Sequence, residues 1–226
     1  SIDDRDGKTF FNVHGTTAEL KPEFYDADAK VAWMDKVGLD IAGISVGPPI
    51  YFYNLPADAG LAAARLANDG IAQMAAKHPK RLRGLAHLPM QDPDAAITEL
   101  ERVVKAYDFR GIEVATSIEG LPLADNKFRK VLKTAEQLKC FIFTHPYQCL
   151  AKGWMEPYYL NNFVGFPLDT TMMVAHLMFS GALDECKELK FLLAHGGGFM
   201  PYQIGRFVHG HRVRHEPDRK STRLNS

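Results

Sequence analysis

The sequence predicts an α/β fold with a parallel sheet. Two uncharged apolar runs, residues 140–145 and 191–195, each end in a histidine, and such runs are typical of strands buried on both faces. From residue 40 onward, apolar runs alternate with segments of helical periodicity, which is the order that builds a parallel sheet. We count five βα units. They are consistent with an incomplete barrel or a doubly wound sheet, because periodicity alone does not distinguish the two.

Five short segments are expected to be strands because they are apolar and bounded by turn residues. The expected strands are residues 40–46, 82–90, 110–116, 140–145 and 190–195. The first of them ends in Gly47-Pro48-Pro49. A long segment rich in aromatic residues, 146–160, follows the fourth strand.

Helices are expected before and between these strands, where apolar residues recur at helical spacing. The expected helices are residues 28–37, 57–78, 92–104, 125–138, 168–179 and 199–211. Pro79 ends the long alanine-rich helix, and Asp92 with Pro93 begins the next one. Asp125 or Asn126 caps the following helix, and Gly181 ends the helix at 168–179.

Composition excludes several classes of partner. The 226 residues carry 27 Lys and Arg against 27 Asp and Glu, and without a basic stripe we expect no nucleic-acid partner. The three cysteines form no CxxC motif and leave one unpaired in any disulfide scheme, which favours a reducing, cytoplasmic location. No apolar stretch is long enough to span a bilayer and no signal peptide is recognisable, so we expect no membrane association.

The candidate functional residues are His145 and His195, because each ends a predicted strand. Ligands bind and chemistry occurs at the carboxyl ends of parallel strands. Strand alternation places Phe143 and His145 on one face, and Phe191, Leu193 and His195 on one face. Two such histidines suit a metal ligand and an acid/base partner. Either histidine alone is better explained as a satisfied core residue, whereas two at equivalent strand ends make the core and the functional interpretations about equal.

Gly196, Gly197 and Gly198 follow His195 and open a predicted helix. Glycines at this place let backbone amides approach a carboxylate or phosphate. The alternative is a tight turn between strand and helix. Arg206 in the helix that follows is positioned for a substrate anion or a partner subunit, or is an ordinary surface arginine.

Other ionisable residues are weaker candidates. His87 lies near a predicted strand end and is a secondary candidate to line the site. Glu113 lies inside a predicted strand, where we interpret it as a buried polar contact rather than a base. The sequence supports neither a Ser-His-Asp triad nor a reactive cysteine, since Cys140 begins a buried strand.

Several motifs together resemble the amidohydrolase-related decarboxylases, and most of all the aminocarboxymuconate-semialdehyde decarboxylases. The motifs are Leu88-Pro-Met-Gln91, Phe141-Ile-Phe-Thr-His145-Pro146, Gly165-Phe-Pro-Leu-Asp-Thr-Thr171 and Ala194-His195-Gly-Gly-Gly198 with Gly205-Arg206 downstream. They occur in the family's order between Asp6 and Gly210.

The resemblance implies a TIM-type (β/α)₈ barrel that holds one divalent metal, usually zinc. It assigns His145 as the metal ligand that ends the fifth strand and His195 as the acid/base at the end of the sixth. Arg206 matches the arginine after the family's glycine run. His14 stands where the muconate enzymes carry a substrate-binding arginine, and imidazole is the weaker, pH-dependent partner for an anion. The family is typically dimeric, so we expect a homodimer when the protein is complete.

Two of the family's features are missing from the sequence. No His-x-His motif precedes Asp3, and no eighth-strand aspartate is present. We therefore expect a barrel that lacks its first and last strands, within a single partial domain at residues 1–217. Residues 218–226 have no hydrophobic period and are interpreted as a non-native tail.

The expected function is metal-dependent decarboxylation of a small carboxylated aromatic or unsaturated acid, in which His195 moves a proton. The residues expected to contact the substrate are Arg206, His14, Gly196, Gly197, Tyr147 and Trp154. One alternative is a hydrolase or hydratase that acts on a lactone or dicarboxylate at the same site. A second alternative is an inactive truncated fragment.

Overall fold

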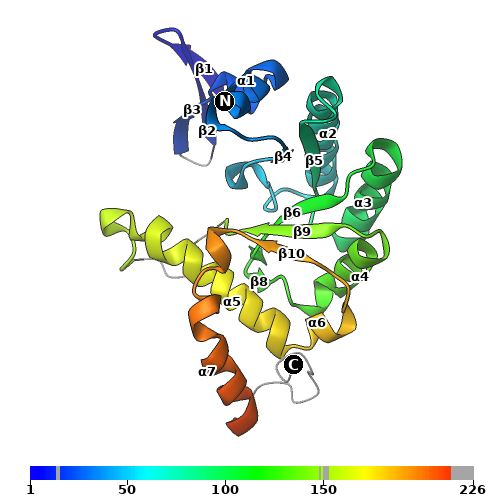
Figure 1. Ribbon diagram of the computed structural model, residues 1–226, viewed down its shortest axis with the longest axis vertical. Coiled ribbons are helices and arrows are strands. Elements are labelled where there is room, and N and C mark those ends of the chain that lie inside the picture. The colour runs from blue at the N-terminus through cyan, green and yellow to red at the C-terminus, as the bar shows by residue number, and fades with distance from the viewer. Residues whose placement is uncertain (14–15, 148, 150–152, 215–226) are drawn as a thin grey trace.

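The computed structural model describes residues 1–13, 16–147, 149 and 153–214. Its main sheet consists of five parallel strands: β4 (Ala42–Ile44), β5 (Leu82–His87), β6 (Gly111–Ala115), β9 (Phe141–His145) and β10 (Phe191–Leu193). Their spatial order, β10-β9-β6-β5-β4, follows the order of the chain (Figure 1). A barrel keeps sequential strand order, whereas a doubly wound sheet reverses it. The five predicted strands are therefore confirmed, and their order is that of part of a barrel.

The six predicted helices are present, and a short seventh, α6 (Ala182–Glu185), was not predicted. The predicted helices are α1 (Ala27–Val37), α2 (Ala57–Lys77), α3 (Pro93–Tyr107), α4 (Arg129–Gln137), α5 (Phe166–Phe179) and α7 (Met200–Val213). Aspartates cap three of the starts: the Asp26 side chain accepts hydrogen bonds from the amides of Asp28 and Ala29, Asp92 from those of Asp94 and Ala95, and Asp125 from that of Lys127. Asp125 caps a short 3₁₀ turn, η3 (Asn126–Phe128), that leads directly into α4.

Two antiparallel elements were not predicted. The N-terminal strands β1 (Ile2–Arg5), β2 (Lys8–Val13) and β3 (Thr16–Glu19) form a small sheet of their own. The pair β7 (Ser117–Ile118) and β8 (Leu121–Pro122) forms a hairpin. Asp6-Gly7 and Glu119-Gly120 turn these chains with positive φ at both residues, which two-residue hairpin loops require. The Asp-Gly pair is the sequence signal for the first hairpin.

The core lies between the sheet and helices α2, α3 and α4, which cover one face of the sheet (Figure 1). Ile112 and Ile142 are partners in neighbouring strands, and both are buried against this helical layer. The opposite face carries Glu113, Phe143 and His145, which correspond to the interior of a barrel. The helical layer therefore holds the sheet and leaves the other face for the site.

The last strand differs from the prediction. Strand β10 ends at Leu193, and its register pairs Leu192 with Phe143. Phe191 and Leu193 therefore face the other side of the sheet from Phe143, and His195 lies beyond the strand. Alternation along the strand was the wrong argument for the direction of His195, because the regular backbone stops two residues earlier.

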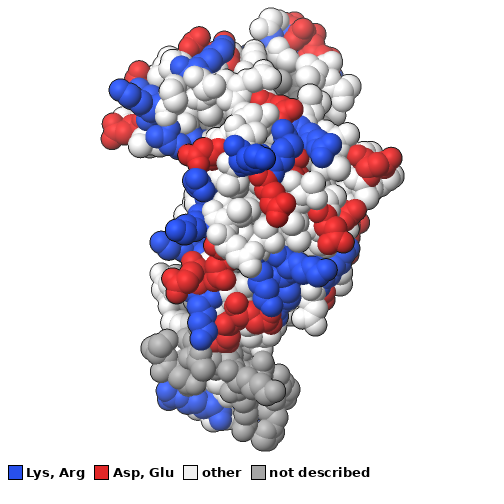
Figure 2. Space-filling model, turned by 90° about the vertical axis from the view of Figure 1, so that its right-hand side faces the viewer, with Lys and Arg blue, Asp and Glu red and all other residues white. Residues whose placement is uncertain are grey.

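Acidic and basic side chains are mixed over the face shown in Figure 2, with no broad area of one sign. Among the residues that the structure describes, no helix has both the length and the apolar character that crossing a membrane demands.

Candidate active site at the carboxyl ends of β9 and β10

His145 is the last residue of β9 and is half-buried. It lies opposite Ala115, the last residue of β6, on the interior face of the sheet. Its ring nitrogen Nδ1 lies 2.8 Å from the carbonyl oxygen of Pro146, so Nδ1–H donates to that oxygen. This hydrogen bond leaves Nε2 as the nitrogen with a free lone pair, which is the arrangement of a metal-ligating histidine.

His195 reaches His145 through a turn rather than through the strand. The amide of Ala194 donates to the Thr144 carbonyl at 3.1 Å, which extends the sheet register one residue past β10. His195 then begins the 3₁₀ turn η6 (His195–Gly197) with φ of 56°, a left-handed conformation that is uncommon for a residue with a side chain. The centroids of the His145 and His195 rings are 4.9 Å apart. The structure thus brings the two predicted histidines together.

The surroundings of His195 favour its neutral form. Desolvation lowers the pKa of His195 below its ordinary value, and the nearby His145 lowers that pKa further. A lowered pKa makes the protonated imidazole a stronger acid, so His195 gives up a proton readily.

Helix α5 contributes two residues that the sequence reasoning missed. The Phe166 ring stacks on His195 with centroids 5.9 Å apart and meets His145 edge-on at 6.0 Å. One turn later, the buried Thr170 places its hydroxyl oxygen 3.5 Å from Nδ1 of His195. Both residues lie in the Gly165–Thr171 motif, which carried the family resemblance but no assigned role.

Glu113 is a buried carboxylate on the same face of the sheet as His145; in the strand register it lies opposite Phe143, two residues before His145. It is 3% exposed and accepts hydrogen bonds from the Tyr51 hydroxyl, at 2.6 Å, and from the Ser45 hydroxyl. Burial is the main cause that raises the pKa of Glu113, and these hydrogen bonds oppose it. The interpretation of Glu113 as a buried polar contact is confirmed.

The glycine turn is partly occupied by its own hydrogen bonds. The Gly197 amide donates to the Ala194 carbonyl at 3.1 Å, and the Gly198 amide donates to the His195 carbonyl at 3.0 Å. These two amides therefore build the turn between strand and helix and are not free for an anion in this conformation. Gly196 is exposed, with φ of 62°.

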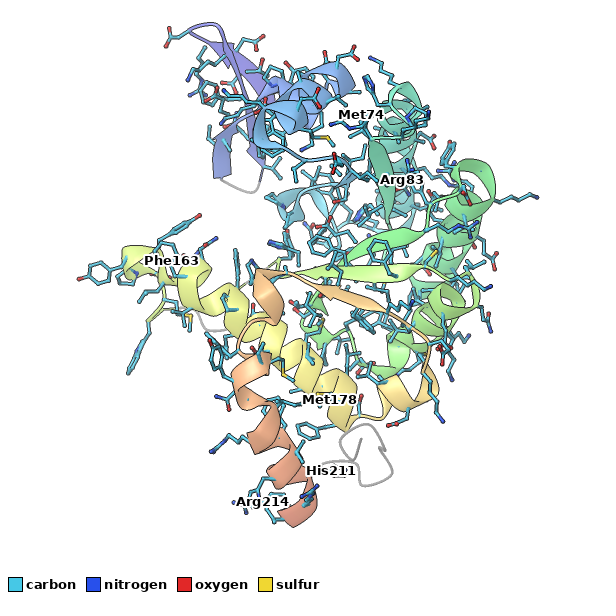
Figure 3. All side chains as sticks on the ribbon, in the orientation of Figure 1. Met74, Arg83, Phe163, Met178, His211 and Arg214 are labelled. Atoms are coloured by element: carbon cyan, nitrogen blue, oxygen red, sulfur yellow. The ribbon has the colours of Figure 1, made fainter. Side chains whose placement is uncertain are left out.

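The remaining predicted substrate residues are dispersed. Tyr147 is half-buried near His145, and its ring centroid lies 5.8 Å from that of Tyr51. Trp154 is 96% exposed. Phe163, which is also exposed, lies far from α7 in Figure 3. Arg206 is exposed on α7 and makes no ion pair with any described residue. His14 lies outside the described residues.

The described part of the chain does not assemble a metal site by itself. Within it, no group of three or more His, Cys, Asp and Glu side chains converges in a way that could hold a metal ion. His145 fits one ligand position by its free Nε2, and a stable site needs further ligands.

The parallel βα units and the two imidazoles at one sheet edge place the chain among barrel proteins with a site at the carboxyl ends of the strands. The model of the amidohydrolase family matches residues 41–215, and the chain belongs to this family. The predicted resemblance and the partial barrel are both confirmed.

Individual relatives share the fold and a moderate level of identity. The chain is 32% identical over 209 residues to the 2-amino-3-carboxymuconate-6-semialdehyde decarboxylase of Dictyostelium discoideum, covering 92% of this chain and 56% of that protein. It resembles the apo structure of the Metarhizium anisopliae IDCase with a TM-score of 0.81 and 27% identity, covering 90% of this chain and 55% of the other.

A third relative contains a metal. The dihydroxybenzoic acid decarboxylase of Polaromonas sp. JS666, solved with bound manganese and the inhibitor 2-nitroresorcinol, matches with a TM-score of 0.70 and 30% identity. The match covers 79% of this chain and 57% of that structure. The chain therefore spans less than two thirds of the length of each of these relatives.

Proposed function

We propose that the complete protein is a decarboxylase that acts on a small carboxylated aromatic or unsaturated acid. The observation that carries the proposal is the closeness of His145 and His195, whose ring centroids lie 4.9 Å apart. The two residues lie at the carboxyl ends of β9 and β10. The Phe166 ring packs against both imidazoles, which supports a fixed arrangement of the two rings at this site. The decarboxylases among the relatives support the reaction type.

His195 is the proposed acid/base. In a decarboxylation the bond between the carboxyl carbon and the substrate carbon breaks, carbon dioxide leaves, and the remaining carbon takes up a proton. His195 is placed to hold that proton and deliver it, and its lowered pKa favours delivery. Thr170 holds the Nδ1 side of the ring, which leaves Nε2 for the substrate.

His145 is the proposed ligand of one divalent metal, for which we propose zinc. The manganese in the Polaromonas relative supports a divalent ion in this family. When bound, such an ion neutralises negative charge on substrate oxygens or lowers the pKa of a bound water molecule. The role of His145 in this chain is to present Nε2, since Pro146 fixes the Nδ1 side of the ring.

The other roles are proposals that rest on the resemblance. Arg206, His14 and Gly196 would hold the carboxylate, and Tyr147 with Trp154 would exclude water. Gly197 was also predicted to contact the substrate, but its amide donates to the Ala194 carbonyl and is not free for an anion in this conformation. A homodimer is proposed because the resemblance implies one, and the exposed Arg206 is available to a partner subunit. A cytoplasmic location and the absence of nucleic-acid and membrane partners stay predictions from composition.

The deciding experiment is His195→Asn in the complete protein. We expect turnover to fall by about 10²-fold or more, with metal content unchanged, because the variant removes the titrating ring and keeps a polar side chain. His176→Asn is the matched control, since His176 is exposed on α5. Full activity of His195→Asn would contradict the assigned role.

A substrate panel separates decarboxylation from the alternative reactions. Carboxylated phenols, unsaturated dicarboxylates and lactones are each incubated with the metal-loaded protein, and carbon dioxide release is measured beside hydration or ring opening. Release of carbon dioxide supports the proposal. Hydrolysis or hydration without it would support the alternative at the same site.

A further inference from the structure

Glu113 is a buried carboxylate for which the proposed chemistry has no use. It lies in register with His87 on one side and Phe143 on the other, on the face of the sheet that bears His145. Carboxylates are rarely this deeply buried unless their oxygens are paired. Glu113 accepts two hydrogen bonds from residues in the segment after β4. The donors are Ser45 and Tyr51, which are 68 and 62 residues away in the sequence.

Tyr51 is held at two places. Its ring packs against those of Tyr53 and His87, with centroids 5.4 Å and 5.7 Å away and interplanar angles of 25° and 12°, and the Tyr53 and His87 rings also contact each other at 5.8 Å. Its backbone carbonyl accepts a hydrogen bond from Nε2 of His87 at 3.0 Å. Its hydroxyl donates to Glu113 at 2.6 Å, so the carboxylate fixes the end of the ring that stacking alone leaves free.

The Tyr147 ring packs against the Tyr51 ring. The centroids of Tyr51 and Tyr147 are 5.8 Å apart and the rings are tilted by 56°. Tyr147 follows His145 by two residues, and the proposed function assigns its ring to the wall of the site beside this proposed metal ligand. The contacts run in sequence from Glu113 through Tyr51 to Tyr147.

We propose that Glu113 is a positioning residue that orients the aromatic wall of the substrate site through Tyr51. It does not touch the reacting atoms; it fixes the Tyr51 ring, and Tyr51 fixes the angle at which Tyr147 faces the substrate. The inference rests on the proposed function, since it assigns Tyr147 to the wall of that site. The wall suits the flat ring or conjugated chain of an aromatic or unsaturated acid.

The chain offers a matched comparison. Glu99 is also fully buried, but it lies in the helical layer, where Asn68 and Arg102 donate hydrogen bonds to it. Tyr53 stacks on Tyr51, yet its buried hydroxyl makes no hydrogen bond to any described residue. Glu99→Gln and Tyr53→Phe therefore remove the same groups without touching the contact between Glu113 and Tyr51.

The first measurement is hydrogen exchange on the complete protein, which needs no substrate. Glu113→Gln and Tyr51→Phe should each speed exchange in the peptide covering residues 144–147 by about fivefold, the change that loss of one hydrogen bond gives in a local opening equilibrium. Glu99→Gln and Tyr53→Phe should leave this peptide at the wild-type rate. Tyr51→Phe decides the question alone where Glu113→Gln does not fold.

The second measurement is steady-state kinetics on the substrate that the panel identifies. Both variants should raise KM about fivefold with a smaller change in kcat, and the double variant should be no worse than either single variant, because both break one contact. Effects that multiply in the double variant, or wild-type KM together with wild-type exchange, would overturn the inference. Faster exchange with an unchanged KM would also overturn it.

Failure of the proposed function is distinguishable from failure of this inference. Where His195→Asn retains full activity but KM and exchange respond to Glu113→Gln, the acid/base assignment fails and the positioning role stands. Where no substrate in the panel reacts, the exchange result alone decides whether Glu113 orders the segment that carries Tyr147.

Discussion

Acidification should destabilise the protein through His87. This side chain is 2% exposed, and burial is the main cause that lowers its pKa from 6.5 to about 4. Its Nε2–H donates to the Tyr51 carbonyl, whereas Nδ1 has no partner among the described residues. Protonation would therefore place an uncompensated positive charge inside the protein, together with a new N–H donor at Nδ1 that has no acceptor among the described residues.

The sign and size follow from the two pKa values. The unfolded chain binds a proton at His87 below pH 6.5, whereas the folded protein binds it only near pH 4. Stability is therefore complete above pH 6.5 and is lost as the pH falls from 6.5 toward 4. At pH 5 this one group lowers the free energy of unfolding by about 2 kcal/mol relative to pH 7.5, and below pH 4 by about 3 kcal/mol.

The assay is urea unfolding of the complete protein at pH 7.5 and pH 5, compared with His87→Gln. Glutamine does not titrate and keeps an N–H donor for the Tyr51 carbonyl, so the variant should lose about 2 kcal/mol less on acidification than the wild type. His176→Gln, on the exposed face of α5, should keep the wild-type pH dependence. Equal losses in the wild type and His87→Gln would refute the reasoning.

Two further predictions concern stability, and thermal unfolding checks both. Gly198→Ala should lower Tm, because the new Cβ would collide with a backbone oxygen of α5 and φ at this residue is +64°. Gly196 also has a positive φ, but a Cβ there would meet no atom within 4 Å. Gly196→Ala should therefore lower the free energy of unfolding by only about 1 kcal/mol. Equal costs would contradict this account. Arg129→Met should lower the free energy of unfolding by about 3 kcal/mol, because it leaves two backbone carbonyls without their donor. Arg129 and Lys133 both pair with Glu185, but the Lys133 pair is exposed. Lys133→Met should therefore change stability by under about 1 kcal/mol. A larger loss of stability in Lys133→Met than in Arg129→Met would contradict this account of the two contacts.

The sequence by itself determined the five strands of the parallel sheet, most helix ends and the family. Uncharged apolar runs such as 141–145 encode strands of the central sheet because their residues become buried or half-buried when the helices cover it. Asp92 and Asp125 mark helix starts because their carboxylates satisfy amides only two or three residues away. These signals are local, so a single sequence carries them.

Only the tertiary structure decided how the site is assembled. His195 turns toward His145 through a left-handed backbone conformation that strand alternation does not predict. Phe166 comes to lie against both histidines because α5 folds back over the sheet edge, and Glu113 meets Tyr51 across 62 residues of sequence. Such contacts depend on which strands become neighbours, and side chains far apart in the chain acquire their partners only when the sheet and its covering helices pack together.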